Sequence, residues 1–339
     1  MNYIGSKYSL LDFLKNTIED VTGFKNGEGK IFGDLFAGTG IVGATFKDLG
    51  YKVISNDMQY YSTVLCKHYI ENSADIDTSL LNTLNELPGT EGFIYKNYCL
   101  GSGSERQYYS DENGKKCDAI RMYLENLKRE GKLSEREYYY YLASLINSID
   151  KYANTASVYG AFLKHLKKSA AKDFKLELLP IYKTGPEGKV FNENINDVVK
   201  KEEVKGDVLY LDPPYNARQY CSNYHMLETI AKYDNPVISG KTGLRSYADQ
   251  KSKYCSRRTV LEDFDDLIKN AKFKYIFLSY NNEGLMTLDE IRNIMEKYGE
   301  YRVYTTDYKR FRADNDSENR VYSADKTVEY LHCLIKKEV

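Results

Sequence analysis

The chain has 339 residues, of which 42% are hydrophobic and 29% are charged, and its formal net charge is −1. This composition is typical of a globular protein with room for one large α/β domain and an insertion, or for two domains. The start of the chain lacks the apolar core of a signal peptide, and no stretch approaches the ~20 apolar residues of a membrane span, so we expect a cytoplasmic protein. The cysteines and histidines show no disulfide or metal spacing, and we expect neither feature.

The predicted secondary structure alternates between strands and helices. Apolar, β-branched and aromatic runs predict strands over residues 30–37, 51–56, 189–192, 207–211, 274–280, 301–306 and 328–336. Residues 41–49 form a short amphipathic helix, and Thr287 with Glu290 has the pattern of a capping box that opens a helix to Tyr298. This alternation predicts an α/β fold of the Rossmann-like type, with a mostly parallel sheet that has an antiparallel edge strand.

One long segment interrupts this alternation. Residues 75–185 show helical periodicity, as in RMYLENLKREG and YYYYLASLINSIDKY, but no alternation typical of strands. We therefore expect one α/β domain made of residues 1–74 and 186–339, with residues 75–185 inserted as a mainly helical subdomain.

Basic residues gather in two regions of an otherwise acidic chain. Residues 113–183 contain 14 basic and 8 acidic residues, and residues 241–258 contain 6 basic residues and one acidic residue. Two basic regions suit a polyanion that contacts part of the surface, although the net charge by itself argues against a nucleic-acid binder. For either region alone, a solvated helix face is the better explanation.

The stretch VLYLDPPYNARQY, residues 208–220, ends a buried strand in a rigid polar turn. Pro213 cannot donate a hydrogen bond to a sheet, so the strand ends at Asp212, and Pro214 keeps Pro213 extended. The Asp212 carboxylate, the Pro213 carbonyl and the Tyr215 ring are therefore presented at the carboxyl edge of the sheet, where open α/β sheets bind ligands. A pair of prolines that only ends a strand leaves the flanking acid and aromatic ring unexplained.

The stretch FAGTGIVG, residues 36–43, follows the first strand and opens a helix. Gly38, Gly40 and Gly43 fit the G-x-G-x-x-G pattern that lets the backbone approach a nucleotide, and Asp57 ends the next strand, where an acid can accept both ribose hydroxyls. The pattern suits a dinucleotide whose pyrophosphate lies on the helix N-terminus, and it also suits S-adenosylmethionine. The glycines alone leave this choice open.

The order of the motifs favours S-adenosylmethionine. The glycine turn and the DPPY turn are expected at the same edge of the sheet. An Asp-Pro-Pro-Tyr turn suits the methylation of a weakly nucleophilic exocyclic amine but has no use in hydride transfer. With the amino-terminal YIGSK, the loop FAGTG, an insertion and LDPPY in that order, the sequence resembles the bacterial DNA adenine-N6 methyltransferases of the Dam-like α group. The resemblance covers most of the chain and is weakest in the insertion. It implies a class I S-adenosylmethionine-dependent methyltransferase fold in which the insertion is a target-recognition subdomain.

The resemblance implies a set of residues that bind S-adenosylmethionine. In the family, the amino-terminal motif, here Tyr3, Gly5, Ser6 and Lys7, closes over the methionine end of the donor. Asp197, in NINDVV, is similar to the family's acid that meets the donor's adenine, although its place at a helix start also suits capping. The expected cofactor-binding residues are Tyr3, Lys7, Phe36, Ala37, Gly38, Thr39, Gly40, Asp57, Asp197 and Asp212.

The resemblance also implies a mechanism and a DNA partner. Asp212 and the Pro213 carbonyl would accept the two N–H bonds of adenine N6, so that the nitrogen lone pair points at the methyl group. The amine is unreachable inside a duplex, so the base would flip out of double-stranded DNA and stack on Tyr215. The expected catalytic residues are Asp212, Pro213, Pro214 and Tyr215, and the expected DNA-binding residues are Tyr215, Asn216, Arg218, Gln219, Tyr220, Lys241, Arg245, Arg257 and Arg258.

Several alternatives stay open. Asn216 also suits a turn cap, and a lone histidine such as His225 is more often a packing residue than a catalyst. The expected setting is a bacterial or phage restriction–modification pair, in which a cognate restriction endonuclease acts on the same site, but no residue separates this from an orphan regulator. An RNA base methyltransferase would not need the long insertion before DPPY. A nicotinamide oxidoreductase that uses GTGIVG would bind NAD and not S-adenosylmethionine.

Overall fold

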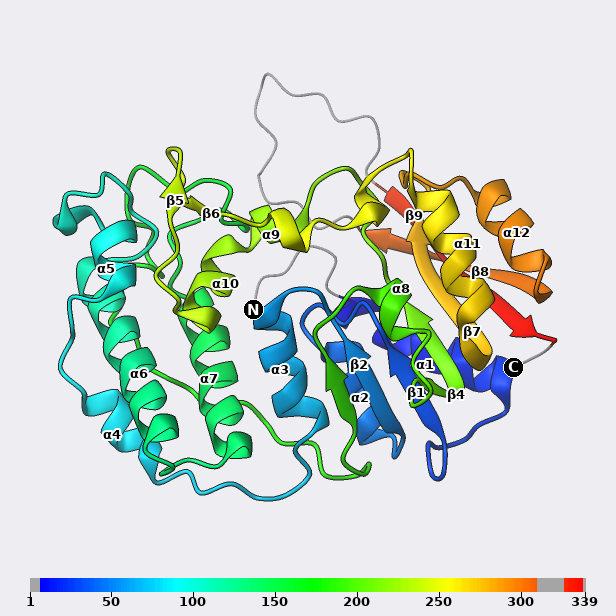
Figure 1. Cartoon of the computed structure of the whole chain (residues 1–339), viewed down its shortest axis with the longest axis horizontal. Coiled ribbons are helices and arrows are strands. Elements are labelled where there is room, and N and C mark those ends of the chain that lie inside the picture. The colour runs from blue at the N-terminus through cyan, green and yellow to red at the C-terminus, as the bar shows by residue number, and fades with distance from the viewer. Residues whose placement is uncertain (1–6, 310–325, 338–339) are drawn as a thin grey trace.

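The computed structural model describes residues 7–309 and 326–337 of the chain. Figure 1 shows two parts side by side, a twisted sheet flanked by helices and a group of helices next to it. Within the described residues, seven strands form the main sheet in the order β3-β2-β1-β4-β7-β9-β8, and β5 pairs with β6 separately. The strands are β1 Ile31–Asp34, β2 Lys52–Asn56, β3 Lys189–Phe191, β4 Lys205–Leu211, β5 Ile238–Ser239, β6 Leu244–Arg245, β7 Lys272–Asn281, β8 Gly299–Lys309 and β9 Lys326–Lys336.

The sheet is mostly parallel, as the sequence predicts. Strands β3, β2, β1, β4 and β7 run parallel to one another, whereas β9 is antiparallel to both β7 and β8. The predicted pairing of the two late strands is confirmed, and so is the antiparallel edge of the sheet. Strand β8 forms the edge, and the antiparallel strand β9 lies one position further in, because it returns between β7 and β8.

Helices cover both faces of the sheet because alternate residues of each strand point to opposite faces. Val208 and Tyr210 of β4 pack in one cluster with residues of α1 and α2, whereas Leu209 and Leu211 pack in another with residues of α8, α11 and α12. A strand buried on both faces is apolar throughout, which explains the run VLYL. The helices of this part are η1 Tyr8–Leu10, α1 Leu11–Thr22, α2 Ile41–Asp48, α3 Tyr60–Ile70, α8 Ile195–Val198, α11 Val260–Asn270 and α12 Leu288–Glu296.

The capping box predicted at the start of α12 is present. The Thr287 side chain accepts a hydrogen bond from the Glu290 backbone N–H, and the Glu290 carboxylate accepts one from the Thr287 backbone N–H. Ser134 and Glu137 form the same arrangement at the start of α7. Each box satisfies N–H groups that a helix start leaves without a partner.

Residues 75–185, all of which the structure describes, contribute helices and no strand to the main sheet. Their apolar side chains share one core with residues of α3 and α10, so segments on either side of the insertion complete it. The helices of this part and of the segment after β4 are α4 Leu80–Glu86, α5 Phe93–Tyr98, η2 Leu100–Ser102, α6 Asp111–Arg129, α7 Glu135–Asp150, α9 Tyr220–Asn223, α10 His225–Lys232, η3 Ala248–Gln250 and η4 Lys253–Cys255.

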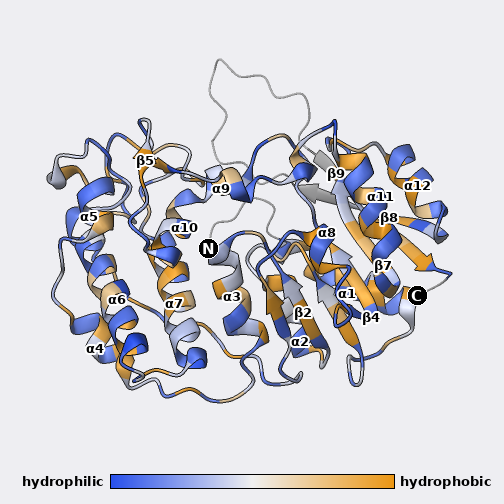
Figure 2. Cartoon of the chain, viewed as in Figure 1, coloured by the Kyte–Doolittle hydropathy of each residue, from blue (hydrophilic) through white to orange (hydrophobic). Residues whose placement is uncertain are grey.

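Hydrophobic residues follow the strands and one side of most helices, whereas hydrophilic residues dominate the loops (Figure 2). This pattern is typical of elements that each bury one face against a core. Within residues 7–309 and 326–337, no helix combines the length and the apolar character that crossing a membrane requires.

Candidate active site

A cavity that is open to solvent lies at the carboxyl ends of β1, β2 and β4. Strands β1 and β4 are direct neighbours, with Asp34 in register with Tyr210, so the turns that follow them meet at this edge. The glycine loop and the DPPY turn therefore line the same cavity, as the sequence predicts for a ligand site in an open α/β sheet. Its walls include Lys7, Asp34, Phe36, Ala37, Gly38, Thr39, Asp57, Ile195, Asp212, Pro214, Gln219, Tyr220, Gln250 and Tyr254.

The glycine loop follows β1 and has a backbone shape that favours glycine. Gly38 and Gly40 have φ angles of 54° and 74°, in the left-handed region that other residues rarely adopt. Gly43 serves packing instead, since a Cβ atom there would lie 3.2 Å from an Asp34 carboxylate oxygen. Gly38 lines the cavity, Gly40 lies against Cys66 of α3 and is absent from the cavity wall, and Gly43 lets α2 pack against the end of β1.

Asp57 closes the loop from the next strand. Its Oδ2 accepts the backbone N–H of Gly38 at 2.8 Å, and its Oδ1 accepts that of Gln59 at 2.8 Å. Burial raises the pKa of Asp57 to about 6, although these backbone hydrogen bonds oppose the shift. A carboxylate oxygen can accept more than one hydrogen bond, so Asp57 still has acceptors for two hydroxyl groups in the cavity.

Asp34 is a second acid in the cavity, and the sequence analysis did not identify it. Its residue exposure is 1%, and its Oδ2 accepts the backbone N–H of Gly43 at 2.9 Å. Burial, together with the Asp212 and Asp57 charges, raises the pKa of Asp34 to about 7, against the hydrogen bond from Gly43. Its place at the end of β1, directly before the glycine loop, was the signal that could have found it.

The DPPY turn brings a third acid to the cavity. Burial raises the pKa of Asp212 to about 6, against the attraction of the Lys7 ammonium. Pro213 is buried, Pro214 lines the cavity, and Tyr215 is half-buried with its ring against the cluster formed by α11 and α12. The Tyr215 carbonyl accepts the backbone N–H of Leu285 at 2.9 Å, which fixes the end of the turn.

Lys7 lies across the DPPY turn although more than 200 residues separate them in the sequence. Its ammonium is 3.2 Å from an Asp212 oxygen and 2.8 Å from an oxygen of Glu329, on β9. Burial disfavours the charge of Lys7, but Asp212 and Glu329 outweigh it and hold the pKa of Lys7 well above its usual value. The other expected residues of the amino-terminal motif, Tyr3, Gly5 and Ser6, lie outside the described residues.

Asp197 does not lie where the sequence analysis expected it. Its side chain is exposed and is absent from the cavity wall, which Asn194, Ile195 and Asn196 form instead. On a helix, neighbouring residues point about 100° apart, so a one-residue difference turns a side chain away from a site. The NINDVV segment is thus at the cavity, but the expectation that Asp197 meets the donor's adenine is corrected.

The segment after the DPPY turn adds further groups to the cavity wall. The Gln219 side chain forms two hydrogen bonds with the backbone of Ser252, at 3.1 and 2.8 Å, and so holds residues 246–258 against this wall. Tyr220 lines the cavity and stacks on Tyr224. Asn216 accepts the backbone N–H of Arg218 at 2.9 Å, which is the turn cap that the sequence left open.

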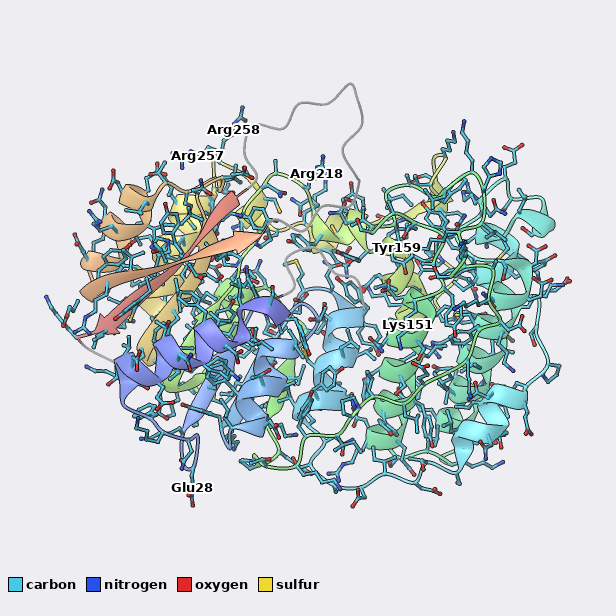
Figure 3. All side chains as sticks on the ribbon, turned by 180° about the vertical axis from the view of Figure 1, so that it is seen from behind. Glu28, Lys151, Tyr159, Arg218, Arg257 and Arg258 are labelled. Carbon is cyan, nitrogen blue, oxygen red and sulfur yellow. The ribbon has the colours of Figure 1, made fainter. Side chains whose placement is uncertain are left out.

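Three expected DNA-binding arginines are exposed on one edge of the molecule. Figure 3 shows Arg218, Arg257 and Arg258 along the edge opposite Glu28. Arg257 also forms an ion pair with Glu290, whose carboxylate belongs to the capping box of α12. Lys241 is exposed as well, in the turn between β5 and β6.

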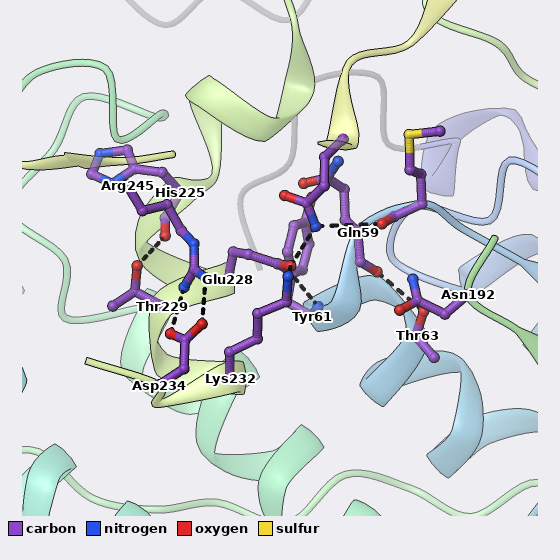
Figure 4. A network of polar contacts seen from close by, with 12 residues as sticks. Gln59, Tyr61, Thr63, Asn192, His225, Glu228, Thr229, Lys232, Asp234 and Arg245 are labelled. Atoms are coloured by element: carbon purple, nitrogen blue, oxygen red, sulfur yellow. Dashed lines mark hydrogen bonds and ion pairs between the residues drawn. The ribbon is translucent and has the colours of Figure 1, made fainter. Parts of the chain in front are cut away.

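Arg245 differs from the other expected DNA-binding residues, and this prediction is corrected. Its side chain is 7% exposed and forms two hydrogen bonds with the Asp234 carboxylate, at 3.1 and 2.7 Å. Figure 4 shows this pair beside α10. A buried guanidinium that forms two hydrogen bonds with a carboxylate is unavailable to a DNA phosphate, because breaking this ion pair would leave a buried charge without a partner.

A buried carboxylate next to this pair connects the helical part to the cavity. Glu228 of α10 accepts the backbone N–H of Tyr61 at 2.9 Å and the Gln250 amide at 2.6 Å, and Lys232 lies 3.0 Å away (Figure 4). Gln250 itself lines the cavity. His225, on the same helix, is buried with one ring nitrogen 3.0 Å from the Tyr159 carbonyl, as expected for a packing histidine.

Comparison with known proteins identifies the family. Residues 3–294 match the model of the D12 class of N6 adenine-specific DNA methyltransferases. The chain belongs to this family. It is 53% identical to the type II methyltransferase M.NlaIII of Neisseria lactamica over 339 residues, 99% of each protein. It is 41% identical to M.FokI of Planomicrobium okeanokoites and 37% identical to the modification methylase StsI of Streptococcus sanguinis, matching 53% and 50% of their respective lengths.

The D12 methyltransferase assignment settles the choice that the glycines left open. The enzyme methylates adenine N6 in DNA and depends on S-adenosylmethionine, so the nicotinamide and RNA alternatives are set aside. The cavity fits this donor, since its glycine loop leaves room for a nucleoside and its acids, Asp34 and Asp57, suit a positively charged ligand with ribose hydroxyls. Phe36 and Tyr254, whose rings meet edge to face at 5.0 Å, offer an apolar wall for a base.

Proposed function

We propose that Asp212 and the Pro213 carbonyl hold the N6 amine of an adenine flipped out of double-stranded DNA, with Tyr215 stacked on the base. The supporting observation is that Asp212 shares one cavity with the glycine loop, at the adjoining ends of β4 and β1. The acceptor for the amine and the residues proposed to bind the donor therefore face the same space. Effective catalysis of a two-substrate reaction requires such an arrangement.

The chemistry follows from the weak nucleophilicity of the amine. Its lone pair is delocalised into the ring, and two acceptors placed against its N–H bonds favour a pyramidal nitrogen with a localised lone pair. S-adenosylmethionine supplies a methyl group on a positively charged sulfur, which keeps the electron pair when the C–S bond breaks. The amine nitrogen forms the new C–N bond, and its surplus proton passes to Asp212 or to water.

We propose that the donor is held by Phe36, Ala37, Gly38, Thr39, Gly40, Asp57 and Lys7. Asp57 would accept the ribose hydroxyls, and Ile195 and Asn196 replace Asp197 as the residues at the adenine end. This choice rests on the residues that form the cavity wall and on the hydrogen bond between Gly38 and Asp57, and Gly40 is included because its positive φ angle shapes the same loop. Asp34 is a further candidate, since it lines the same cavity as Asp57.

We propose that DNA lies along the edge that carries Arg218, Arg257 and Arg258 (Figure 3), with the exposed Lys241 of the β5–β6 turn as a further basic contact. Loops at the carboxyl ends of the strands form this edge, so a flipped base would enter the cavity from it. Residues 75–185 would form the target-recognition subdomain between catalytic segments 1–74 and 186–339. Their helices and the shared core with α3 and α10 support a rigid unit beside the cavity.

The substitution Asp212→Ala tests the assignment of the amine site. We expect methylation of DNA to be lost while S-adenosylmethionine binds nearly as tightly as before, measured by titration calorimetry. Asp207→Asn is a matched control at the other end of β4, where Asp207 accepts the backbone N–H of Ile31 at 2.9 Å. It should retain turnover. The assignment would be contradicted if Asp212→Ala bound S-adenosylmethionine more weakly and its loss of methylation were fully explained by that weaker binding.

We also propose that the enzyme is the modification partner of a type II restriction system, with a cognate endonuclease that cuts the same site. The relatives named as type II and modification methyltransferases support this setting. Single-molecule sequencing of DNA methylated by the enzyme would identify the site. A restriction endonuclease encoded beside it should then fail to cut the methylated DNA, whereas cleavage of fully methylated DNA would argue for an orphan role.

A further inference from the structure

Glu329 is a buried acid that lies behind the DPPY turn and outside the 3–294 segment that matches the family model. It belongs to β9, where it is in register with Asn281 of β7 and Thr306 of β8. Its Oε1 accepts hydrogen bonds from the Ser279 hydroxyl at 2.7 Å and from the Lys7 ammonium at 2.8 Å. Ser279 therefore orients the carboxylate that holds Lys7.

Lys7 is shared between two carboxylates. It lies 2.8 Å from Glu329 and 3.2 Å from Asp212, and the side chains of Lys7 and Glu329 are 8% and 6% exposed. One positive charge therefore faces two negative charges in a region that is mostly closed to water. The shorter contact is to Glu329. The negative charge of Asp212 is therefore stabilised less by Lys7 than it would be if Lys7 contacted Asp212 alone.

We infer that Glu329 is a positioning residue that anchors Lys7 behind Asp212 and so keeps the Asp212 carboxylate available to the target amine. This inference rests on the proposed role of Asp212. A carboxylate in an exclusive ion pair with a lysine is a weaker acceptor, because the ammonium already attracts its charge. Held by Glu329, Lys7 contacts Asp212 through one carboxylate oxygen, and Asp212 itself lines the cavity.

The charges around Asp212 agree with this role. The groups that act on it electrostatically from the elements around it are Lys7, Tyr210, Glu329, Asp34 and Tyr220. Burial raises the pKa of Asp212 to about 6, and the Glu329 charge raises it while Lys7 lowers it. A carboxylate with a raised pKa better accepts the proton that leaves N6 once the C–N bond has formed and the C–S bond has broken.

The test compares Glu329→Gln with the wild-type enzyme. Glutamine preserves the shape of the side chain but removes its charge, so Lys7 should move its attraction to Asp212. We expect the single-turnover methylation rate at pH 7.5 to fall about tenfold, the scale of one pKa unit. The acid limb of the pH–rate profile should move to lower pH, because loss of the Glu329 charge lowers the pKa of Asp212. Donor affinity should change by less than about threefold, and Glu329→Asp should restore part of the rate.

Glu300→Gln is the matched control, since Glu300 lies on β8 and pairs only on the surface with Arg302 within the described residues. It should leave rate, pH profile and donor affinity unchanged. A Glu329→Gln enzyme with the wild-type rate and acid limb would overturn the inference, and so would a rate loss explained fully by weaker donor binding. If Asp212→Ala loses methylation as proposed and Glu329→Gln has no effect, the inference fails alone. If Asp212→Ala keeps methylation, the proposed function itself fails.

Discussion

Gly38 donates its backbone N–H to the Asp57 carboxylate at 2.8 Å, which joins the loop after β1 to the end of β2. Gly38 makes this bond with a φ angle of 54°, and the bond orients the acid that we assign to the donor's ribose. Loop shape and acid position therefore depend on the same residue.

The substitution Gly38→Val should remove donor binding. A β-branched residue at positive φ costs about 1–2 kcal/mol, and its side chain would also project from a cavity wall. Gly23→Val is the matched control, because Gly23 has a φ angle of 73° with open space around it at the end of α1. Both variants should lose similar thermal stability, but only Gly38→Val should lose S-adenosylmethionine binding in calorimetry. If the two variants bound S-adenosylmethionine equally well, the glycine loop would be a structural turn and not part of the donor site.

Tyr215→Phe should keep most activity, and Tyr215→Ala should lose about one to two orders of magnitude in turnover. The reason is that stacking uses the ring face, and base–aromatic stacking is worth about 1–3 kcal/mol per base. Single-turnover rates on duplex DNA measure this loss. The defect of Tyr215→Ala should shrink on a substrate whose target adenine is mismatched, because extrusion of the base then costs less. A Phe variant as weak as the Ala variant would place Tyr215 outside the base pocket.

Arg258→Gln and Arg245→Gln should have opposite effects. Arg258 is exposed on the proposed DNA edge, so its loss should weaken DNA binding and reduce the slope of log affinity against log salt by about one, without changing thermal stability. Arg245 is buried against Asp234, so its loss should cost about 1–3 kcal/mol of folding free energy. Denaturant unfolding and DNA titrations at several salt concentrations separate the two. A stable Arg245→Gln enzyme with a reduced salt slope would restore Arg245 to the DNA interface.

Asp34→Asn should stabilise the ligand-free protein more at pH 8 than at pH 5. The folded-state pKa of Asp34 is raised from 3.8 to about 7, so the folded state binds its proton more tightly than the unfolded state between these pH values. Ionised Asp34 therefore lowers the free energy of unfolding as the pH rises through this window, by roughly 2–4 kcal/mol in total. Asparagine removes this cost, and unfolding curves at the two pH values measure the difference. If the free energies of unfolding of the variant and the wild type differ by the same amount at pH 5 and pH 8, the prediction is wrong and Asp34 has an ordinary pKa.

Local chemistry explains what the amino-acid sequence alone could predict about this protein. A proline such as Pro213 ends a strand because it has no backbone N–H, and glycines such as Gly38 favour turns with positive φ angles. The two motifs and the strands before them could therefore be predicted from the sequence. Alternation of strands and helices then predicts a mostly parallel sheet, and such a sheet brings Asp212 and the glycine loop to one edge. These features depend on few neighbours, and the neighbours are close in sequence.

The remaining features depend on which distant elements pack together. Asp197 points away from the cavity because of the rotation of α8, and Arg245 is buried because the strand that carries it packs so that its guanidinium meets Asp234. Lys7 and Glu329 are 322 residues apart, and only the return of β9 between β7 and β8 brings them into contact. Whether a charged side chain meets solvent or a buried partner is decided by the packing of these elements, because desolvation and Coulomb attraction act over a few ångströms in space, at any separation in sequence.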